Sequence, residues 1–239
     1  DGQTIVEQLT CEGPGLNGDK LQLAAVRVPI KASWENDRLV VDQLTMTCDL
    51  GEASFAGTLD GSGGWSKALE RKPFRVVGHV DLAKLAAALP RTLRVRDDAR
   101  ITAGRIELEI DAQPQGEAVV WQGRLETTQL AAVAAGEQIT WDKPMLVTFA
   151  AHEAADGWQV DKLNGEADFL RLEGSGSAHQ GQVTGSCDFD RLSHELARFV
   201  NVGELRMSGT GTSKVHWQRA DDGHFRLDGQ LDAQRFELS

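Results

Sequence analysis

Apolar and polar residues alternate along most of this chain with a period of two. The alternation is clearest over residues 39–50, 74–80, 101–110, 118–125 and 145–151. A period of two places successive side chains on opposite faces of an extended strand. Each segment is therefore predicted to be a β-strand with one apolar and one polar face, as is typical of antiparallel meanders. Within the first segment the alternation slips at Asp42–Gln43.

Two short segments have the period of a helix instead, and each follows a strand. In both, an aspartate comes directly before the apolar residues, Asp81 in one and Asp188 in the other. A carboxylate at this place accepts a hydrogen bond from the free N–H groups of the first turn, so both are predicted N-caps. The Ala-rich residues 127–135 predict a third short helix, capped by Thr127 or Thr128. The apolar positions of the first two helices are Leu82, Leu85, Ala86, Leu89 and Leu93, and then Phe189, Leu192, Leu196 and Phe199.

The same order of elements occurs twice. Residues 41–57 and 160–176 both begin Val-Asp-(Gln/Lys)-Leu and end on Gly, and the strand–helix segment 77–93 has a counterpart at 184–200. We therefore expect a single elongated repeat domain over residues 1–239, with approximate repeats at 20–126 and 139–232. The predicted fold class is mostly β: a curved antiparallel sheet of repeated meanders, forming a groove, with two or three short amphipathic helices.

The net charge and the ends of the chain limit the kinds of partner that we expect. The sequence has 36 acidic and 25 basic residues, a net charge of −11. Such a charge opposes binding to nucleic acid and to anionic membrane surfaces. No apolar run reaches the roughly 18 residues that span a bilayer. Because the chain begins at Asp1 without a signal-peptide pattern, we expect a fragment of a larger protein, with any membrane anchor outside this chain.

The residues that usually carry chemistry show no catalytic or metal-binding pattern. The chain has an odd number of cysteines, Cys11, Cys48 and Cys187, and no two of them form a CxxC pair. Cys48 and Cys187 occupy apolar positions of alternating runs. A disulfide between Cys11 and Cys48 is left open. The six histidines lack metal-ligand spacing, and the pair Asp97-Asp98 is interpreted as a turn. Without a nucleophile elbow, Walker loop or dinucleotide fingerprint, we expect no catalytic residue, metal or cofactor.

The two strand–helix junctions resemble those of the AsmA/TamB-like proteins of Gram-negative envelopes. The resemblance is carried by residues 78–85 (GHVDLAKL) and 185–192 (GSCDFDRL), and by the two Val-Asp runs at 41–57 and 160–176. It implies a long groove of curved β-sheet with a lipid-facing interior and no catalytic residues. It further implies a periplasmic protein that is anchored in the inner membrane and takes part in phospholipid traffic to the outer membrane.

The predicted function is therefore non-enzymatic: the apolar side of a β-groove binds or conducts lipid acyl chains. Three alternatives stay open. The apolar faces can pack on each other as an ordinary sandwich core, the chain can be an envelope scaffold that docks protein partners through its sheet, or it can be an enzyme on polysaccharide or lipid. The residues predicted to line the groove and its helices are Leu39, Val41, Leu44, Met46, Val76, Val80, Leu82, Leu85, Leu89, Ile106, Leu108, Met145, Val147, Phe149, Phe189, Leu192 and Leu196.

Overall fold

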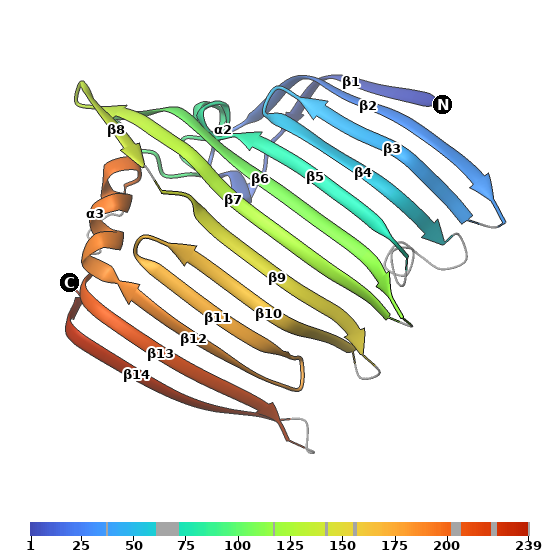
Figure 1. Cartoon of the computed structure of the whole chain (residues 1–239). Coiled ribbons are helices and arrows are strands. Elements are labelled where there is room, and N and C mark those ends of the chain that lie inside the picture. The colour runs from blue at the N-terminus through green and yellow to red at the C-terminus, as the bar shows by residue number, and fades with distance from the viewer. Residues whose placement is uncertain are drawn as a thin grey trace.

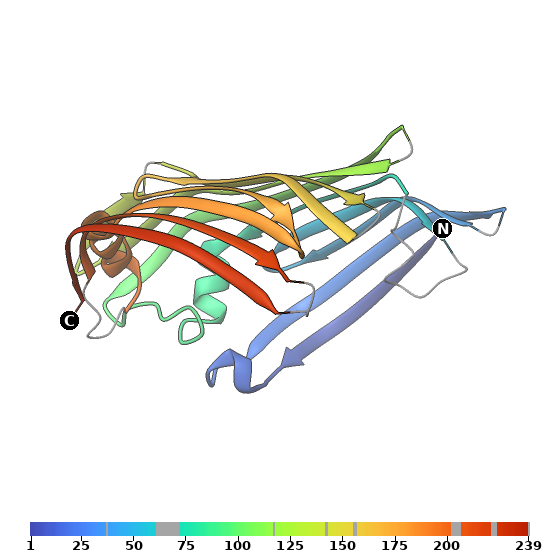
Figure 2. The same ribbon diagram turned by 90° about the horizontal axis from the view of Figure 1, so that it is seen from below.

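The described chain forms one 14-stranded antiparallel sheet with two short α-helices. The computed structural model describes residues 1–36, 38–60, 72–116, 118–141, 143–154, 157–201, 207–220 and 224–238. The predicted fold class is confirmed, because the structure is mostly β and the sheet is open and curved (Figures 1 and 2). Successive strands are neighbours in the sheet, except that β8 pairs with β7 outside this order.

The elements are bounded as follows: β1 Gly2–Cys11, the 3₁₀ turn η1 Pro14–Leu16, β2 Leu21–Glu35, β3 Arg38–Cys48, β4 Gly51–Asp60, β5 Phe74–Asp81, α2 Leu82–Ala88, β6 Ala99–Gln115, β7 Ala118–Ala134, β8 Glu137–Trp141, β9 Met145–Ala154, β10 Gly157–Ala167, β11 Leu170–Ser177, β12 Gln180–Asp188, α3 Phe189–Phe199, β13 Met207–Arg219 and β14 Phe225–Leu238.

The sheet arches over both helices, which lie on its concave side (Figure 2). All strands end at one of two rims. At the first, which we call the helix rim, β5 leads into α2 and β12 leads into α3. At the second, the open rim, β2 turns at Asn36 and β6 turns at Gly116. The two described helices, α2 and α3, thus both lie at the helix rim.

Both helices begin as the sequence predicts. The Asp81 carboxylate accepts a hydrogen bond from the Lys84 N–H at 3.0 Å, and the Asp188 carboxylate accepts one from the Arg191 N–H at 2.9 Å. The predicted N-caps are therefore confirmed. Each cap satisfies one N–H group that the first helical turn leaves without a backbone partner.

The helix predicted over residues 127–135 is wrong, because this segment is the second half of strand β7. It pairs with β6 on one side and with β8 on the other. Gln129, at φ 56°, interrupts the strand, so that Thr127 and Leu130 face the same side although they are three residues apart. Because of this bulge, the apolar residues have the three-residue spacing that is typical of a helix. The Ala-rich composition favours a helix, but strand pairing on both sides stabilises the extended conformation instead.

The slip in the alternation at Asp42–Gln43 corresponds to a β-bulge. Val41 pairs with Gly57 and Leu44 with Phe55, so β3 has two residues where β4 has one. The same irregularity recurs in β10, between Val160 and Leu163 opposite β11. The boundaries of the two repeats stay a prediction.

The molecule exposes far more surface than a compact protein of its mass. Its accessible surface is 15609 Å² for 26.0 kDa, whereas a compact monomer of that mass exposes about 10,500 Å². In the described chain no large side chain is less than 2% exposed. A single sheet without a second sheet packed on it explains both facts, so the alternative of a sandwich core is wrong.

Candidate functional site

One row of residues on the concave face runs across the sheet from β3 to β14. Residues paired directly across antiparallel strands point to the same face, so the pairing register identifies the members of such a row. All of them except Ser213 are apolar or glycine. This floor row consists of Met46, Ala53, Gly78, Leu108, Leu125, Val147, Gly165, Leu172, Gly185, Ser213 and Leu231.

The adjacent row on the convex face has the opposite character. Its members are polar or charged apart from Val77. This outer row consists of Thr45, Ser54, Val77, Glu109, Arg124, Thr148, Asn164, Glu173, Thr184, Lys214 and Gln230. The sheet therefore has one apolar and one polar face over almost its whole width, as the alternating sequence predicts.

The middle of the floor row is open to solvent. Leu125 and Val147 are cross-strand partners on β7 and β9, and they are 41% and 38% exposed. Leu231 lies further along the same row and is 73% exposed. Large apolar side chains that adjoin one another and stay exposed mark a binding surface in a soluble protein.

Glycines in the concave face let large side chains lie flat on the floor. A Cβ atom added at Gly123 would come within 1.9 Å of the ring of Phe149, and one at Gly181 within 2.2 Å of the indole of Trp217. The ring therefore covers the glycine of the neighbouring strand, as in the aromatic rescue of glycine in sheets. The result is an apolar floor with few protruding side chains, on the side where curvature crowds the strands together.

The helix rim is closed by an apolar cluster beneath α3. Phe199 of α3 stacks on Trp141 of β8 at 5.9 Å between ring centroids, and Phe169 lies 5.6 Å from the same indole. Ala132, Ala134 and Ile139 complete the buried part of the cluster. This cluster forms a wall along one side of the floor.

A belt of polar contacts continues this wall towards β1 and β2. The segment after α2 reaches η1, where the Thr92 hydroxyl donates to the Leu16 carbonyl at 2.7 Å and the Thr92 N–H donates to Asp19 at 2.7 Å. The same segment reaches the end of α3, because Arg96 donates to the Ala197 carbonyl at 2.7 Å. The belt therefore connects three parts of the chain that are distant in sequence and spans the helix rim.

The carboxylates of the belt have lowered pKa values. Burial raises the pKa of Asp19, but the hydrogen bonds from Thr92 and the nearby Arg91 outweigh it and bring that pKa below its usual value. The hydrogen bonds and charge of Arg96 likewise lower the pKa of Asp98. Both groups therefore stabilise the belt in their ionised form.

An aromatic cluster lies at the open rim. Phe74 stacks on Phe55 at 6.1 Å and meets the edge of Trp121 at 4.6 Å, and Trp121 meets Trp158 at 4.8 Å. Phe74 is 4% exposed, and Ala112 and Val119 beside it are also buried. Among the residues that the structure describes, the floor thus lies between this cluster and the wall at the helix rim.

The predicted lining residues fall into two groups. The strand positions Leu39, Val41, Leu44, Met46, Val76, Val80, Ile106, Leu108, Met145, Val147 and Phe149 all lie on the concave face. Of the helical positions, Leu82 lies against Gly104, Phe189 against Gly211, and Leu192 against the wall cluster. Leu89 is buried, and Leu85 and Leu196 are half-buried. The structure thus places the strand residues on the concave face, Leu192 against the wall cluster, and Leu82 and Phe189 against glycines of the sheet.

Three leucines of the floor row are absent from the predicted set, namely Leu125, Leu172 and Leu231. Leu125 and Leu231 lie in alternating runs of the sequence, VWQGRL and FRLDGQL. Continuing the alternation to the end of each strand would have included them. Leu172, in the run LRLEG, differs because charged neighbours on both sides make a short stretch look polar.

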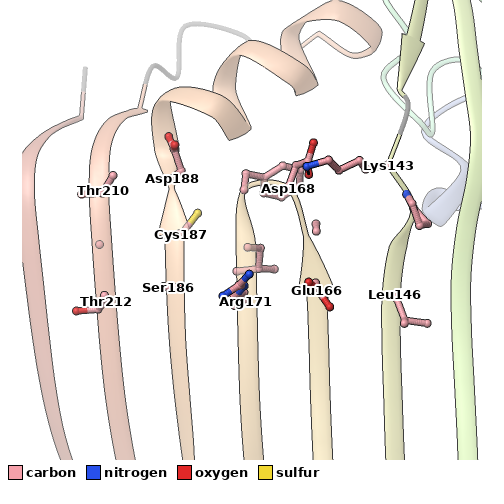
Figure 3. A pocket seen from close by; sticks show the side chains of 15 residues that line it. Lys143, Leu146, Glu166, Asp168, Arg171, Ser186, Cys187, Asp188, Thr210 and Thr212 are labelled. Atoms are coloured by element: carbon pink, nitrogen blue, oxygen red, sulfur yellow. Dashed lines mark ion pairs between the residues drawn. The ribbon is translucent and has the colours of Figure 1, made fainter.

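A second candidate site is a hollow of about 660 Å³ near the helix rim (Figure 3). The Asp168 carboxylate at the β10–β11 turn lies 2.6 Å from the Lys143 ammonium group and 2.8 Å from the Arg191 guanidinium group. Both cations thus share one carboxylate, which ties α3 to the two neighbouring turns. Burial, followed by the charge of Asp188, raises the pKa of the Cys187 thiol. A protonated thiol is a poor nucleophile, so we interpret this hollow as a structural ion network.

Other chemical features of the described chain are few. All three cysteines are free, so the disulfide left open between Cys11 and Cys48 is not formed here. Among the described residues, no three or more His, Cys, Asp or Glu side chains gather where they could hold a metal ion. Asp97 and Asp98 form a turn, as predicted. In the same part of the chain, neither helix has the length and apolar content needed to cross a membrane.

Comparison with known proteins gives no relative from which a function can be transferred. No family model matches the chain, and neither the curated proteins nor the solved structures contain a match.

Proposed function

We propose that the concave face of this sheet binds lipid acyl chains without catalysis, as a segment of a protein that conducts phospholipid across the cell envelope. The observation that carries the proposal is the contrast between the apolar floor row and the polar outer row. An acyl chain requires a continuous apolar surface and no specific polar partner.

The dimensions of the floor suit this role. From β3 to β14 the floor row crosses ten strand-to-strand steps. At about 4.8 Å a step, its length along the sheet is about 48 Å. The hydrocarbon thickness of one bilayer leaflet is about 15 Å, half of a 30 Å core. The floor therefore offers room for several chains placed end to end.

The resemblance supports a location in the cell envelope. The two strand–helix junctions, at residues 78–85 and 185–192, resemble those of AsmA/TamB-like envelope proteins. We therefore place the chain in the periplasm, with its inner-membrane anchor supplied by a segment outside these residues.

A scaffold in the envelope is the second candidate. It is supported by the outermost strand β14, on which Leu227 and Leu231 are 70% and 73% exposed. An edge strand with exposed apolar residues can add a strand from a protein partner. In that case the concave face would serve only to shape the sheet.

Native mass spectrometry after detergent-free purification tests the lipid proposal. We expect co-purified phospholipid on the wild-type chain and its loss when Leu125→Asp and Val147→Asp place two charges on the floor. The matched control is Val77→Asp with Val133→Asp, because these valines are 40% and 39% exposed on the convex face. Far-UV circular dichroism checks that both variants fold. No lipid on the wild-type chain, or equal lipid on the two variants, would contradict the proposal.

A further inference from the structure

The segment that follows α2 carries a local positive charge in an acidic chain. Residues 91–100 contain four arginines and two aspartates, a net charge of +2, whereas the whole chain carries −11. At physiological ionic strength charges are screened over about 8 Å, so the nearest side chains decide which ion a surface attracts. This segment therefore attracts an anion although the chain as a whole repels one.

Two of these arginines line a hollow of about 500 Å³, which we call the arginine hollow. It lies between the turn after α2, the turn η1 and the end of α3. Its polar lining consists of Arg91, Arg94, Asn17, Asn201 and Asp97. Small-molecule sites in proteins measure about 300–1,000 Å³. With two guanidinium groups against one carboxylate among its described lining residues, the hollow has the size and the charge of a site for a small anion.

The guanidinium groups of the hollow keep donors for a ligand. Among the described residues, neither Arg91 nor Arg94 makes an ion pair. The carboxylate near Arg91 is Asp19, which already accepts hydrogen bonds from the Thr92 N–H at 2.7 Å and the Thr92 hydroxyl at 2.9 Å. A guanidinium group presents five N–H donors in a planar fork that matches the oxygens of a phosphate.

Backbone hydrogen bonds fix the two arginines relative to each other. The Arg94 N–H donates to the Arg91 carbonyl at 3.1 Å, and the Asn201 N–H donates to the Arg94 carbonyl at 2.7 Å. Arg94 has φ 51°, a left-handed conformation that few residues other than glycine adopt. Such strain persists only where the surrounding contacts impose it, and it is frequent at ligand sites. The turn therefore presents both side chains to the hollow from a preorganised backbone.

We propose that Arg91 and Arg94 bind the phosphate group of a phospholipid whose acyl chains lie on the floor. The turn lies on the concave side of the sheet (Figure 2), because α2, which precedes it, packs through Leu82 on Gly104 of β6. The concave side thus combines an apolar floor with a cationic hollow, as a phospholipid combines apolar chains with a phosphate. Arginine forks bind phosphate oxygens through paired, charge-assisted hydrogen bonds. The assignment rests on the proposed function, since free phosphate has the same chemistry without the chains.

Isothermal titration calorimetry of the full chain with two short-chain lipids tests the phosphate site. Dihexanoyl phosphatidic acid and dihexanoylglycerol carry the same acyl chains and differ only in the phosphate. We expect the wild-type chain to bind the phosphatidic acid about tenfold or more tightly than the glycerol lipid, because only the former makes charge-assisted hydrogen bonds. The variant with Arg91→Gln and Arg94→Gln is expected to lose this difference and to bind dihexanoylglycerol as the wild-type chain does. Far-UV circular dichroism checks that the variant folds.

Matched variants separate the fork from the charge. Arg27→Gln with Arg38→Gln removes the same charge at two exposed arginines outside the hollow and is expected to keep the preference for phosphatidic acid. Arg94→Lys keeps the charge but not the fork and is expected to give an intermediate preference.

The remaining outcomes distinguish the possible ligands. Sodium phosphate alone is expected to bind more weakly than phosphatidic acid, and equal or tighter binding would identify free phosphate as the ligand and overturn the lipid assignment. Equal affinities for the two lipids, or a preference that the variant of Arg91 and Arg94 retains, would overturn this inference while the acyl-chain proposal stands. Binding of neither lipid would contradict both.

Discussion

The aromatic cluster at the open rim makes a strong prediction about stability. Phe74 is 4% exposed and contacts Phe55 and Trp121. A buried aromatic side chain removes about 150–250 Å² from water, and at about 25 cal/mol per Å² the lower end of this range corresponds to roughly 4 kcal/mol. This value lies within the range of about 3–5 kcal/mol measured for Phe→Ala in protein cores. We therefore expect Phe74→Ala to lower the free energy of unfolding by about 4 kcal/mol.

Thermal unfolding followed by circular dichroism measures this loss. For a chain of this length, 1 kcal/mol lowers Tm by about 2–4 °C, so the expected decrease is about 8–16 °C. Val77→Ala on the convex face of the same strand is the control, and it is expected to change Tm by no more than about 2 °C. A decrease for Phe74→Ala that is no larger than that for Val77→Ala would show that the cluster does not hold the open rim together.

Two further predictions concern the helix rim. Asp188→Ala removes the N-cap of α3 and is expected to cost about 0.5–2 kcal/mol of unfolding free energy, whereas Asp188→Asn keeps an acceptor and is expected to cost much less; equal losses in urea titrations of the two variants would contradict the cap. The lowered pKa of Asp19 implies that its contribution to stability is complete above the ordinary carboxyl pKa of about 3.9 and is lost as the pH falls through the folded-state value. Asp19→Asn is therefore expected to flatten the decrease in Tm over the acidic range, and a decrease identical to that of the wild-type chain would refute this.

Local features of this fold could be predicted from the sequence. The alternation of apolar and polar residues determines which side of each strand faces the concave side, as Val147 and Thr148 show on β9. The caps Asp81 and Asp188 act within one helical turn. The bulge at Asp42–Gln43 leaves a visible slip in the alternation.

Features that depend on distant parts of the chain could not be predicted in this way. The second half of β7 is a strand because β6 and β8 pair with it, although its own composition favours a helix. The contact of Thr92 with Asp19 joins residues on either side of four strands, and nothing in either local sequence indicates it. Whether apolar faces pack on one another or stay open is likewise decided by the number of sheets, which no single strand reveals.

Photo-cross-linking of the folded chain with a phospholipid that carries a diazirine in its acyl chain, followed by peptide mapping, tests whether the concave face holds hydrocarbon. We expect adducts at Leu125, Val147 and their neighbours in the floor row, and none at Val77 or Val133. Adducts distributed equally over both faces, or confined to the convex face, would contradict the claim that the concave side of this sheet holds hydrocarbon.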